Sequence, residues 1–157
     1  MSLHYIIDGY NLIKHRSFPP AKKTGDERLV LLEFIRTKKL CGSSRNKITV
    51  VFDGYAGDFK TGDCDIEVIF SQELTADERI KKIVCARGNT VNFVVISDDR
   101  EIKDFVKSSR VKAVGIEEFI HHKKKKANLE DESLKPELTY SAMHKINQEL
   151  KQIWLKP

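Results

Sequence analysis

The sequence predicts an α/β domain with a mainly parallel central sheet and helices on both faces. Short β-rich runs alternate with amphipathic helical runs through the first 120 of the 157 residues. This alternation is typical of βαβ units. The run Ile48–Phe52 is unbroken and rich in β-branched residues, as expected of a strand that is buried on both faces.

Five strands are expected, and a turn or a helix follows each of them. In chain order they are His4–Ile7, Ile48–Phe52, Ile66–Phe70, Val91–Ile96 and Val111–Gly115. A basic loop over Lys14–Lys23 separates the first strand from the first expected helix. Gly42 and Gly88 mark the ends of the first two helices, because glycine favours the backbone conformation that closes a helix.

The helix starts are predicted from capping boxes, in which a side chain and a glutamate three residues later satisfy free backbone N–H groups. Three residue pairs have this spacing: Thr24 with Glu27, Thr75 with Glu78, and Asp98 with Glu101. The first of these helices carries Leu29, Leu32, Ile35 and Lys39 at helical spacing, and we expect the three helices to run to Lys39, Ala86 and Ser108. A short helical turn is expected over Ile116–His121.

We predict three parts in the chain: a domain over 1–122, a charged linker over 123–138 and an amphipathic helix over 139–157. The linker begins with four consecutive lysines. Apolar residues then recur at helical spacing and form one stripe: Tyr140, Met143, Ile146, Leu150, Ile153 and Trp154. Such a stripe either packs on the domain or binds a partner, including a second copy in a homodimer.

Composition limits the possible functions. No apolar run approaches the roughly 20 residues that span a bilayer, and no secretory signal is recognisable, so no membrane partner is expected. The three cysteines do not form a Cys-x-x-Cys pair, which argues against a zinc site and for a reducing, cytoplasmic location. The formal net charge of +5 favours polyanions such as RNA as partners.

Acidic residues follow three of the predicted strands. These are Asp8, Asp53 and the adjacent pair Asp98 and Asp99, and Asp77 lies in the first turn of the helix after the third strand. The carboxyl ends of parallel strands share one edge of a sheet, where ligands bind. Clustered carboxylates repel one another, and Mg²⁺ or Mn²⁺ would relieve this repulsion. The pattern therefore favours metal-assisted phosphodiester hydrolysis.

Each acid also has a purely structural interpretation. Asp8 and Asp53 precede glycines and suit turns, Asp77 suits the positive end of a helix dipole, and Asp98 suits a helix N-cap. Other phosphate chemistries fit less well. Tyr10 stands where phosphotransferases of the haloacid-dehalogenase type carry a second aspartate, and there is no Walker-type phosphate loop.

Four motifs in order resemble the NYN domain, a branch of the PIN-like nucleases, and in particular its bacterial YacP-type subgroup. They are Ile6–Ile13, Val50–Gly54, Glu67–Ser71 with Thr75–Glu78, and Val94–Asp98 with Arg100 and Glu101. The resemblance covers about residues 4–120. It implies a three-layer α/β/α PIN-like fold with strand order 3-2-1-4-5. It also implies a Mg²⁺- or Mn²⁺-dependent endoribonuclease, and a YacP-type relative is described as cleaving mRNA on the ribosome.

By matched position, the resemblance implies that Asp8, Asp77 and Asp98 are the catalytic, metal-binding acids. Asn11 and Asp53 would be auxiliary residues. Asp99 directly follows Asp98, so either of the two acids can face the metal, and we expect Asp98 because it directly follows the serine that ends the strand.

RNA binding is expected from basic and aromatic residues near the same sheet edge. Lys14, His15 and Arg16 follow the first strand, and Arg79 lies close to Asp77 along the chain. Tyr10, like Tyr55, lies just beyond a strand and suits stacking on a base. Two other functions remain open at this point: a non-catalytic RNA- or ribosome-binding module, and a toxin-type nuclease held by an antitoxin. The cleaved RNA sequence, the number of ions and the oligomeric state are not encoded in any recognisable pattern.

Overall fold

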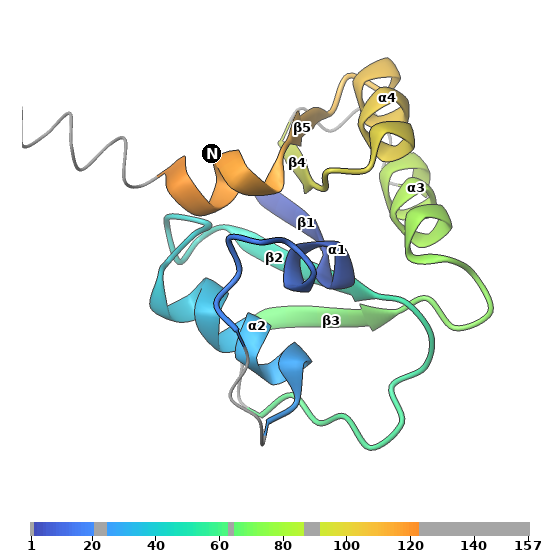
Figure 1. Cartoon of the computed structure of the whole chain (residues 1–157). Helices are drawn as coiled ribbons and strands as arrows, with labels where there is room; N and C mark the ends of the chain where they lie inside the picture. The colour runs from blue at the N-terminus through green and yellow to red at the C-terminus, as the bar shows by residue number, and fades with distance from the viewer. Residues whose placement is uncertain (1, 21–24, 63–64, 87–91, 123–157) are drawn as a thin grey trace, which may run out of the picture. The chain divides into compact units, whose positions relative to one another are not determined.

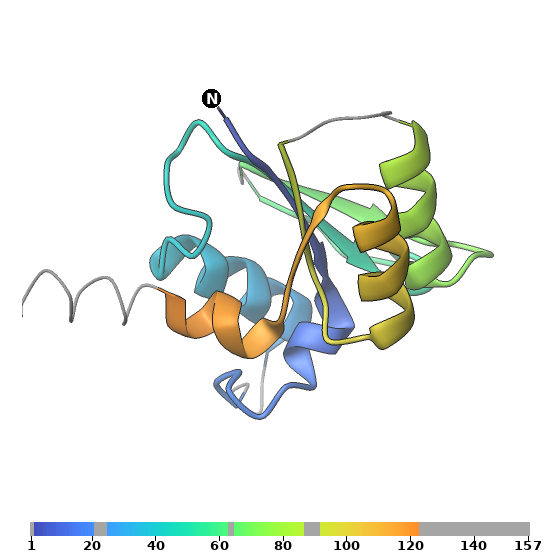
Figure 2. The same ribbon diagram turned by 90° about the horizontal axis from the view of Figure 1, so that it is seen from above.

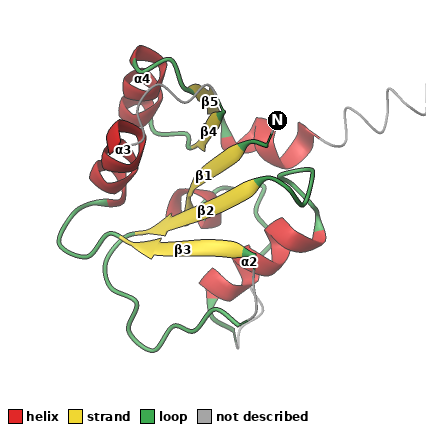
Figure 3. Ribbon diagram, turned by 180° about the vertical axis from the view of Figure 1, so that it is seen from behind, coloured by secondary structure: helices red, strands yellow, loops and turns green. Residues whose placement is uncertain are grey.

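The central feature of the structure is a five-stranded parallel sheet of order β3-β2-β1-β4-β5 (Figure 1). The computed structural model describes residues 2–20, 25–62, 65–86 and 92–122. The strands are β1 (His4–Asp8), β2 (Lys47–Phe52), β3 (Ile66–Phe70), β4 (Phe93–Ile96) and β5 (Lys112–Val114). The predicted fold class and strand order are confirmed. Figure 3 shows β1, β2 and β3 pointing the same way, so their carboxyl ends share one edge.

Helices cover both faces of the sheet. Figure 2 shows α3 (Ala76–Ala86) and α4 (Arg100–Ser108) on one side, and α2 (Glu27–Thr37) with a helical segment over 116–122 on the other. Successive side chains of a strand point to opposite faces. Ile7 and Val50 therefore join the core on the α2 side, and Ile6 and Val51 join the core on the α3 side. β1 is buried on both faces and holds its last residue, Asp8, firmly at the centre of the sheet edge.

The helix starts differ from two of the three predicted capping boxes. Thr75 and Glu78 form the predicted box, with the Glu78 N–H donating to Thr75 Oγ1 and the Thr75 N–H donating to Glu78 Oε2. The prediction for α2 is wrong, because Asp26 is its N-cap and accepts a hydrogen bond from the Arg28 N–H at 2.9 Å. Asp26 lies directly before the first helical residue, where a carboxylate reaches the free N–H groups.

Three further predictions need correction. A short helix, α1 (Gly9–Ile13), follows β1 at once, where only a turn into the basic loop was expected. The predicted apolar face of α2 included Leu29, but this side chain is 44% exposed and Leu31 is buried instead. The N-cap of α4 is Asp99 and not Asp98. The predicted linker and C-terminal helix lie outside the described residues.

Candidate active site

Four aspartates gather at the carboxyl edge of the sheet, each from a different segment. Asp8 ends β1, Asp53 directly follows β2, Asp77 is the second residue of α3 and Asp99 directly precedes α4. Their charges interact, since Asp77, Asp99 and Asp53 all raise the pKa of Asp8. The convergence of Asp8, Asp53 and Asp77 that the sequence predicts is therefore present in the structure.

Asp8 is the most deeply placed of these acids, with only 6% of its surface exposed. Burial and the neighbouring acids raise its pKa from 3.8 to about 6, while the Asn11 N–H, 3.4 Å from Oδ1, opposes the shift. A buried carboxylate favours its neutral form unless a cation or donors compensate its charge. The hydrogen bond from the Asn11 N–H is long and lowers the pKa of Asp8 less than burial raises it. A buried carboxylate with a raised pKa is the electrostatic setting expected of a cation ligand.

The close packing beside Asp8 requires a glycine at the next position. A Cβ on Gly9 would lie only 2.4 Å from Cε1 of Phe52, which is itself fully buried. Tyr10 then packs edge-on against the same ring, with centroids 5.2 Å apart. The glycine after Asp8 is thus required by packing against Phe52. The chain also passes from β1 into α1 at this point, since β1 ends at Asp8 and α1 begins at Gly9.

Asp53 and the capping box fix the start of α3, which carries Asp77. Asp53 Oδ1 accepts hydrogen bonds from the Ala76 N–H at 3.1 Å and from Ser71 Oγ at 3.0 Å. Burial raises the pKa of Asp77, Asp99 and Glu101 raise it further, and Lys81 acts in the opposite direction. The auxiliary role predicted for Asp53 therefore has a physical basis, because its carboxylate ties the end of β2 to the first turn of α3.

The adjacent acids Asp98 and Asp99 point to different partners. Asp98 Oδ1 accepts a hydrogen bond from the Ile116 N–H at 2.9 Å, and Lys103 Nζ lies 3.5 Å from the same oxygen. Asp98 Oδ2 lies 3.4 Å from His15 Nε2. Asp99 caps α4 through Oδ1, which accepts from the N–H groups of Glu101 and Ile102. Burial raises the pKa of Asp8 and of Asp77, and the charge of Asp99 adds to both shifts. Asp99 therefore interacts electrostatically with the acid cluster, whereas Asp98 contacts His15 and the Ile116 N–H. These contacts favour Asp99 as the third acid of the cluster, and the metal-facing role of Asp98 stays a prediction.

A cavity of about 550 Å³ opens beside the acids. Its lining residues are Asp8, Tyr10, Asn11, Lys14, His15, Asp53, Thr75, Ala76 and Asp77. Three acids thus share one cavity with two basic side chains. Tyr10 and Lys14, which were predicted to bind substrate, line the cavity, and Tyr10 also belongs to the core.

Two predicted substrate-binding residues are not among the described residues that line this cavity. Arg16 is 86% exposed and its guanidinium lies 3.7 Å from Glu117. Arg79 follows Asp77 by only two residues, but its side chain is not at the cavity. Its Nε nitrogen is buried and has no hydrogen-bond partner among the described residues. Proximity along the chain did not predict these positions, because successive helical residues point in different directions.

The number of acidic side chains that can contact one ion determines how a divalent cation would be held at this site. Among the described residues, no three His, Cys, Asp or Glu side chains converge closely enough to hold an ion directly. Mg²⁺ needs less than this, because it commonly binds one or two carboxylates and keeps several waters. Asp8 and Asp77, both with raised pKa, line a cavity that has room for an ion with several waters, and they suit that mode of binding. The residues therefore fit a hydrated cation better than a closed, fully protein-ligated one.

Two functional contributions were weakly signalled in the sequence. The Ser71 hydroxyl donates a hydrogen bond to Asp53 Oδ1 and accepts one from the Gly54 N–H at 3.0 Å. These two bonds restrain the loop after β2. His15 was noted only as part of a basic run, but it lines the cavity and contacts Asp98. The partners of Ser71 are 17 and 18 residues away along the chain, and Asp98 follows His15 by 83 residues, so no local pattern indicates either role.

The comparisons with known proteins agree with this architecture. The profile of the YacP-like NYN domain matches residues 5–156, beyond the stretch of the four motifs. Two crystal structures of Rae1 (YacP) from Bacillus subtilis are similar to this chain, each at 22% identity. The W164L mutant has a TM-score of 0.60 with 91% of each chain covered, and the other structure has a TM-score of 0.58 with 97% of this chain and 94% of that one covered. None of the curated protein sequences matches this chain significantly. A profile match over nearly the whole length identifies the chain as a member of the YacP-like NYN domain family, which has a nuclease-type fold.

Proposed function

We propose that this protein is a divalent-metal-dependent endoribonuclease that hydrolyses phosphodiester bonds of RNA. The observation that carries the proposal is the buried carboxylate of Asp8, which shares its cavity with Asp77 and has a pKa of about 6. Perturbed acids in a cavity are typical of functional sites. Membership of a family with a nuclease-type fold supports phosphodiester chemistry.

In this proposal Asp8 and Asp77 hold Mg²⁺ or Mn²⁺, and Asp99 rather than Asp98 is the third acid. Bound there, the ion would neutralise phosphate charge and lower the pKa of a water for attack on phosphorus. Asp53 positions Asp77 through the Ala76 N–H. Lys14 and His15 line the same cavity and are placed to bind the phosphates that flank the cleaved bond.

The proposed substrate is mRNA, engaged in the cytoplasm and in association with the ribosome, as the family resemblance implies. None of the helices in the described ranges has the length and hydrophobicity that crossing a bilayer requires. The formal charge of +5 supports a polyanionic partner, since basic residues release counterions from RNA on binding.

The test is cleavage of a labelled single-stranded RNA by purified wild type, Asp8→Asn and Asp77→Asn in the presence of Mn²⁺. Cleavage should need the metal, should stop on chelation and should be lost in both variants. Asp104→Asn, an exposed acid on α4, is the matched control and should cleave normally. Undiminished cleavage by both site variants would refute the proposal. Salt-sensitive RNA binding without any cleavage by wild type would favour the non-catalytic binding module instead.

A further inference from the structure

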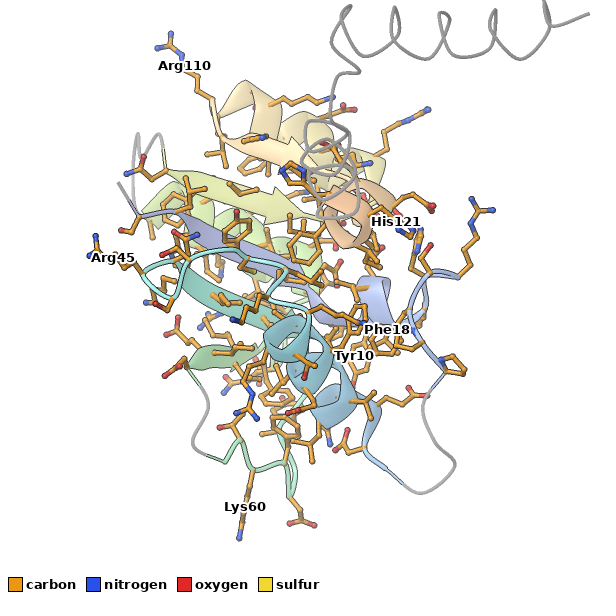
Figure 4. The ribbon with its side chains drawn as sticks, turned by 90° about the vertical axis from the view of Figure 1, so that its left-hand side faces the viewer. Tyr10, Phe18, Arg45, Lys60, Arg110 and His121 are labelled. Atoms are coloured by element: carbon orange, nitrogen blue, oxygen red, sulfur yellow. The ribbon has the colours of Figure 1, made fainter. Side chains whose placement is uncertain are left out.

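One carboxylate outside the acid cluster collects four polar side chains from two segments. Glu117 lies in the first turn of the helical segment 116–122, next to the loop that follows α1. Glu117 Oε2 accepts a hydrogen bond from Ser17 Oγ at 3.3 Å and lies 3.7 Å from both His15 Nε2 and Arg16 Nη2. Oε1 lies 3.6 Å from His121 Nε2. Figure 4 shows His121 on the same side of the molecule as Phe18, which follows this loop, while Arg45, Lys60 and Arg110 project elsewhere.

This arrangement has the composition of a binding position for a phosphate. A guanidinium, a hydroxyl and imidazole nitrogens face a single negative charge, and these are groups that bind phosphate oxygens in nucleic-acid complexes. The present occupant is loosely held. The Glu117 side chain is 53% exposed, that of Arg16 is 86% exposed, and the contacts are long. Exposed ion pairs of this kind stabilise a fold only slightly, so the carboxylate is readily displaced.

Asp98 provides a contrast on the other side of His15. Its Oδ1 accepts the Ile116 N–H at 2.9 Å, a backbone contact that fixes the carboxylate in place. Removal of Asp98 would therefore leave a backbone donor without its partner. Within the described part of the chain, the Glu117 side chain contacts only other side chains and no backbone donor. Of these two acids beside the loop, Glu117 is the one that can yield its place.

The position continues the cavity that holds Asp8. His15 belongs to both places, because it lines the cavity and also contacts Glu117. RNA carries a phosphate at every nucleotide, so a strand bound at the acids presents a neighbouring phosphate to the adjoining surface. Four consecutive lysines, 123–126, directly follow the helical segment in the sequence.

We propose that Glu117 occupies the place of a second RNA phosphate, which binds Arg16, Ser17 and His121 when the carboxylate is displaced. The inference rests on the proposed function, because it assigns a substrate-binding position to the same site. The Glu117 carboxylate then competes with the RNA phosphate for the same side chains, and it weakens RNA binding until the phosphate displaces it.

The test measures RNA affinity directly, using the full-length chain with Asp8→Asn to prevent cleavage. A fluorescent single-stranded oligonucleotide is titrated at several salt concentrations against this protein and against the same protein carrying Glu117→Gln. The matched control is Glu118→Gln, which removes the same charge from the next position of the helix. We expect Glu117→Gln to bind at least about threefold more tightly than Glu118→Gln, an effect in the range of exposed charge interactions. The slope of log K against log salt should become steeper by about 0.7, as for one additional phosphate on a single strand.

A second variant tests whether the effect is local. Adding Arg16→Gln to Glu117→Gln should cancel the gain, whereas adding Arg110→Gln, which removes the same charge from an exposed residue elsewhere on the surface, should leave most of the gain in place. Equal losses in the two double variants would mean that only net charge had changed. Equal affinities for the Glu117 and Glu118 variants, or weaker binding by Glu117→Gln, would overturn the inference. If wild type nevertheless cleaves RNA, the proposed function survives that result. If wild type neither binds nor cleaves RNA, both proposals fail.

Discussion

The carboxylate of Asp53 accepts a hydrogen bond from the backbone N–H of Ala76, 3.1 Å away. This bond joins the residue after β2 to the first residue of α3. Asp77, the next residue, is thereby placed at the cavity by contacts that it does not make itself. Positioning of one acid by another explains why Asp53 can matter to the chemistry without binding a cation.

Replacement of Asp53 should separate its hydrogen-bonding role from its charge. Asp53→Ala leaves the Ala76 N–H without its acceptor and should lower the free energy of unfolding by about 1 kcal/mol, as for loss of a helix cap. Asp53→Asn keeps an oxygen at this position and should be close to wild type in stability. Urea unfolding of the two variants measures this difference. Equal losses in both would mean that the negative charge, and not the acceptor, stabilises α3.

The buried carboxylate of Asp8 should make the metal-free protein less stable as the pH rises. Its pKa in the folded state is about 6, above its ordinary value of 3.8, so the folded protein binds this proton more tightly than the unfolded chain does. The contribution of Asp8 to stability is therefore fully present below about pH 4, is lost as the pH rises from about 4 through 6, and stays lost above that range. A shift of this size corresponds to about 3 kcal/mol.

Asp8→Asn removes this titration while retaining an oxygen for the Asn11 N–H. In the presence of a chelator, its free energy of unfolding should equal that of wild type near pH 4 and exceed it by up to about 3 kcal/mol at pH 7.5. Unfolding curves at several pH values give the difference, in which all other titrating groups cancel. A difference that does not change with pH would contradict the assignment.

A bound cation should reverse this destabilisation. A ligand that binds only the folded state at 100 times its dissociation constant adds about 2.7 kcal/mol to the free energy of unfolding. Mn²⁺ should therefore raise the melting temperature of wild type at pH 7.5, and the increase should be lost in Asp8→Asn. Asp104→Asn should retain the full increase. Equal increases in all three proteins would place the bound ion elsewhere.

The two adjacent acids before α4 should respond differently to substitution. Asp99→Asn keeps the N-cap but removes the charge near Asp8, so it should lower the pKa of Asp8 and weaken Mn²⁺ binding at little cost in stability. Asp99→Ala should in addition destabilise the fold by about 1 kcal/mol. Asp98→Asn should weaken Mn²⁺ binding less than Asp99→Asn. The opposite order would restore Asp98 as the metal-facing acid.

The positions of the strands were predictable to within one or two residues at each end because local patterns determine them, whereas the strand order was implied by the family resemblance. The run Ile66–Phe70 was predicted with the bounds that the structure has, and the capping box of Thr75 and Glu78 was predicted correctly. The helix α1 was missed because its five residues are too few to show a helical repeat. Leu29 was placed on the apolar side of α2 from its spacing alone, but in the structure Leu29 is exposed and Leu31 is buried.

The acid cluster was predictable from the position of Asp8, Asp53 and Asp77 relative to the strands. The choice between Asp98 and Asp99 was not, because both precede a helix and either has the chemistry of an N-cap. The partners that engage Asp98 are His15 and the Ile116 N–H, which are far away in the sequence. Only the folded chain shows that Asp98 contacts the cavity residue His15 and the Ile116 N–H, and that the charge of Asp99 adds to the pKa shift of Asp8.

The direction of β1 has a practical consequence for experiments on this protein. The strand enters the sheet at His4 and reaches the acid edge at Asp8, about 13 Å further on at the usual rise per residue. An affinity tag or a surface tether attached before His4 would thus be anchored at the far end of the strand from the cavity. Immobilisation through this end would leave the edge that carries the acids open to molecules arriving from solution.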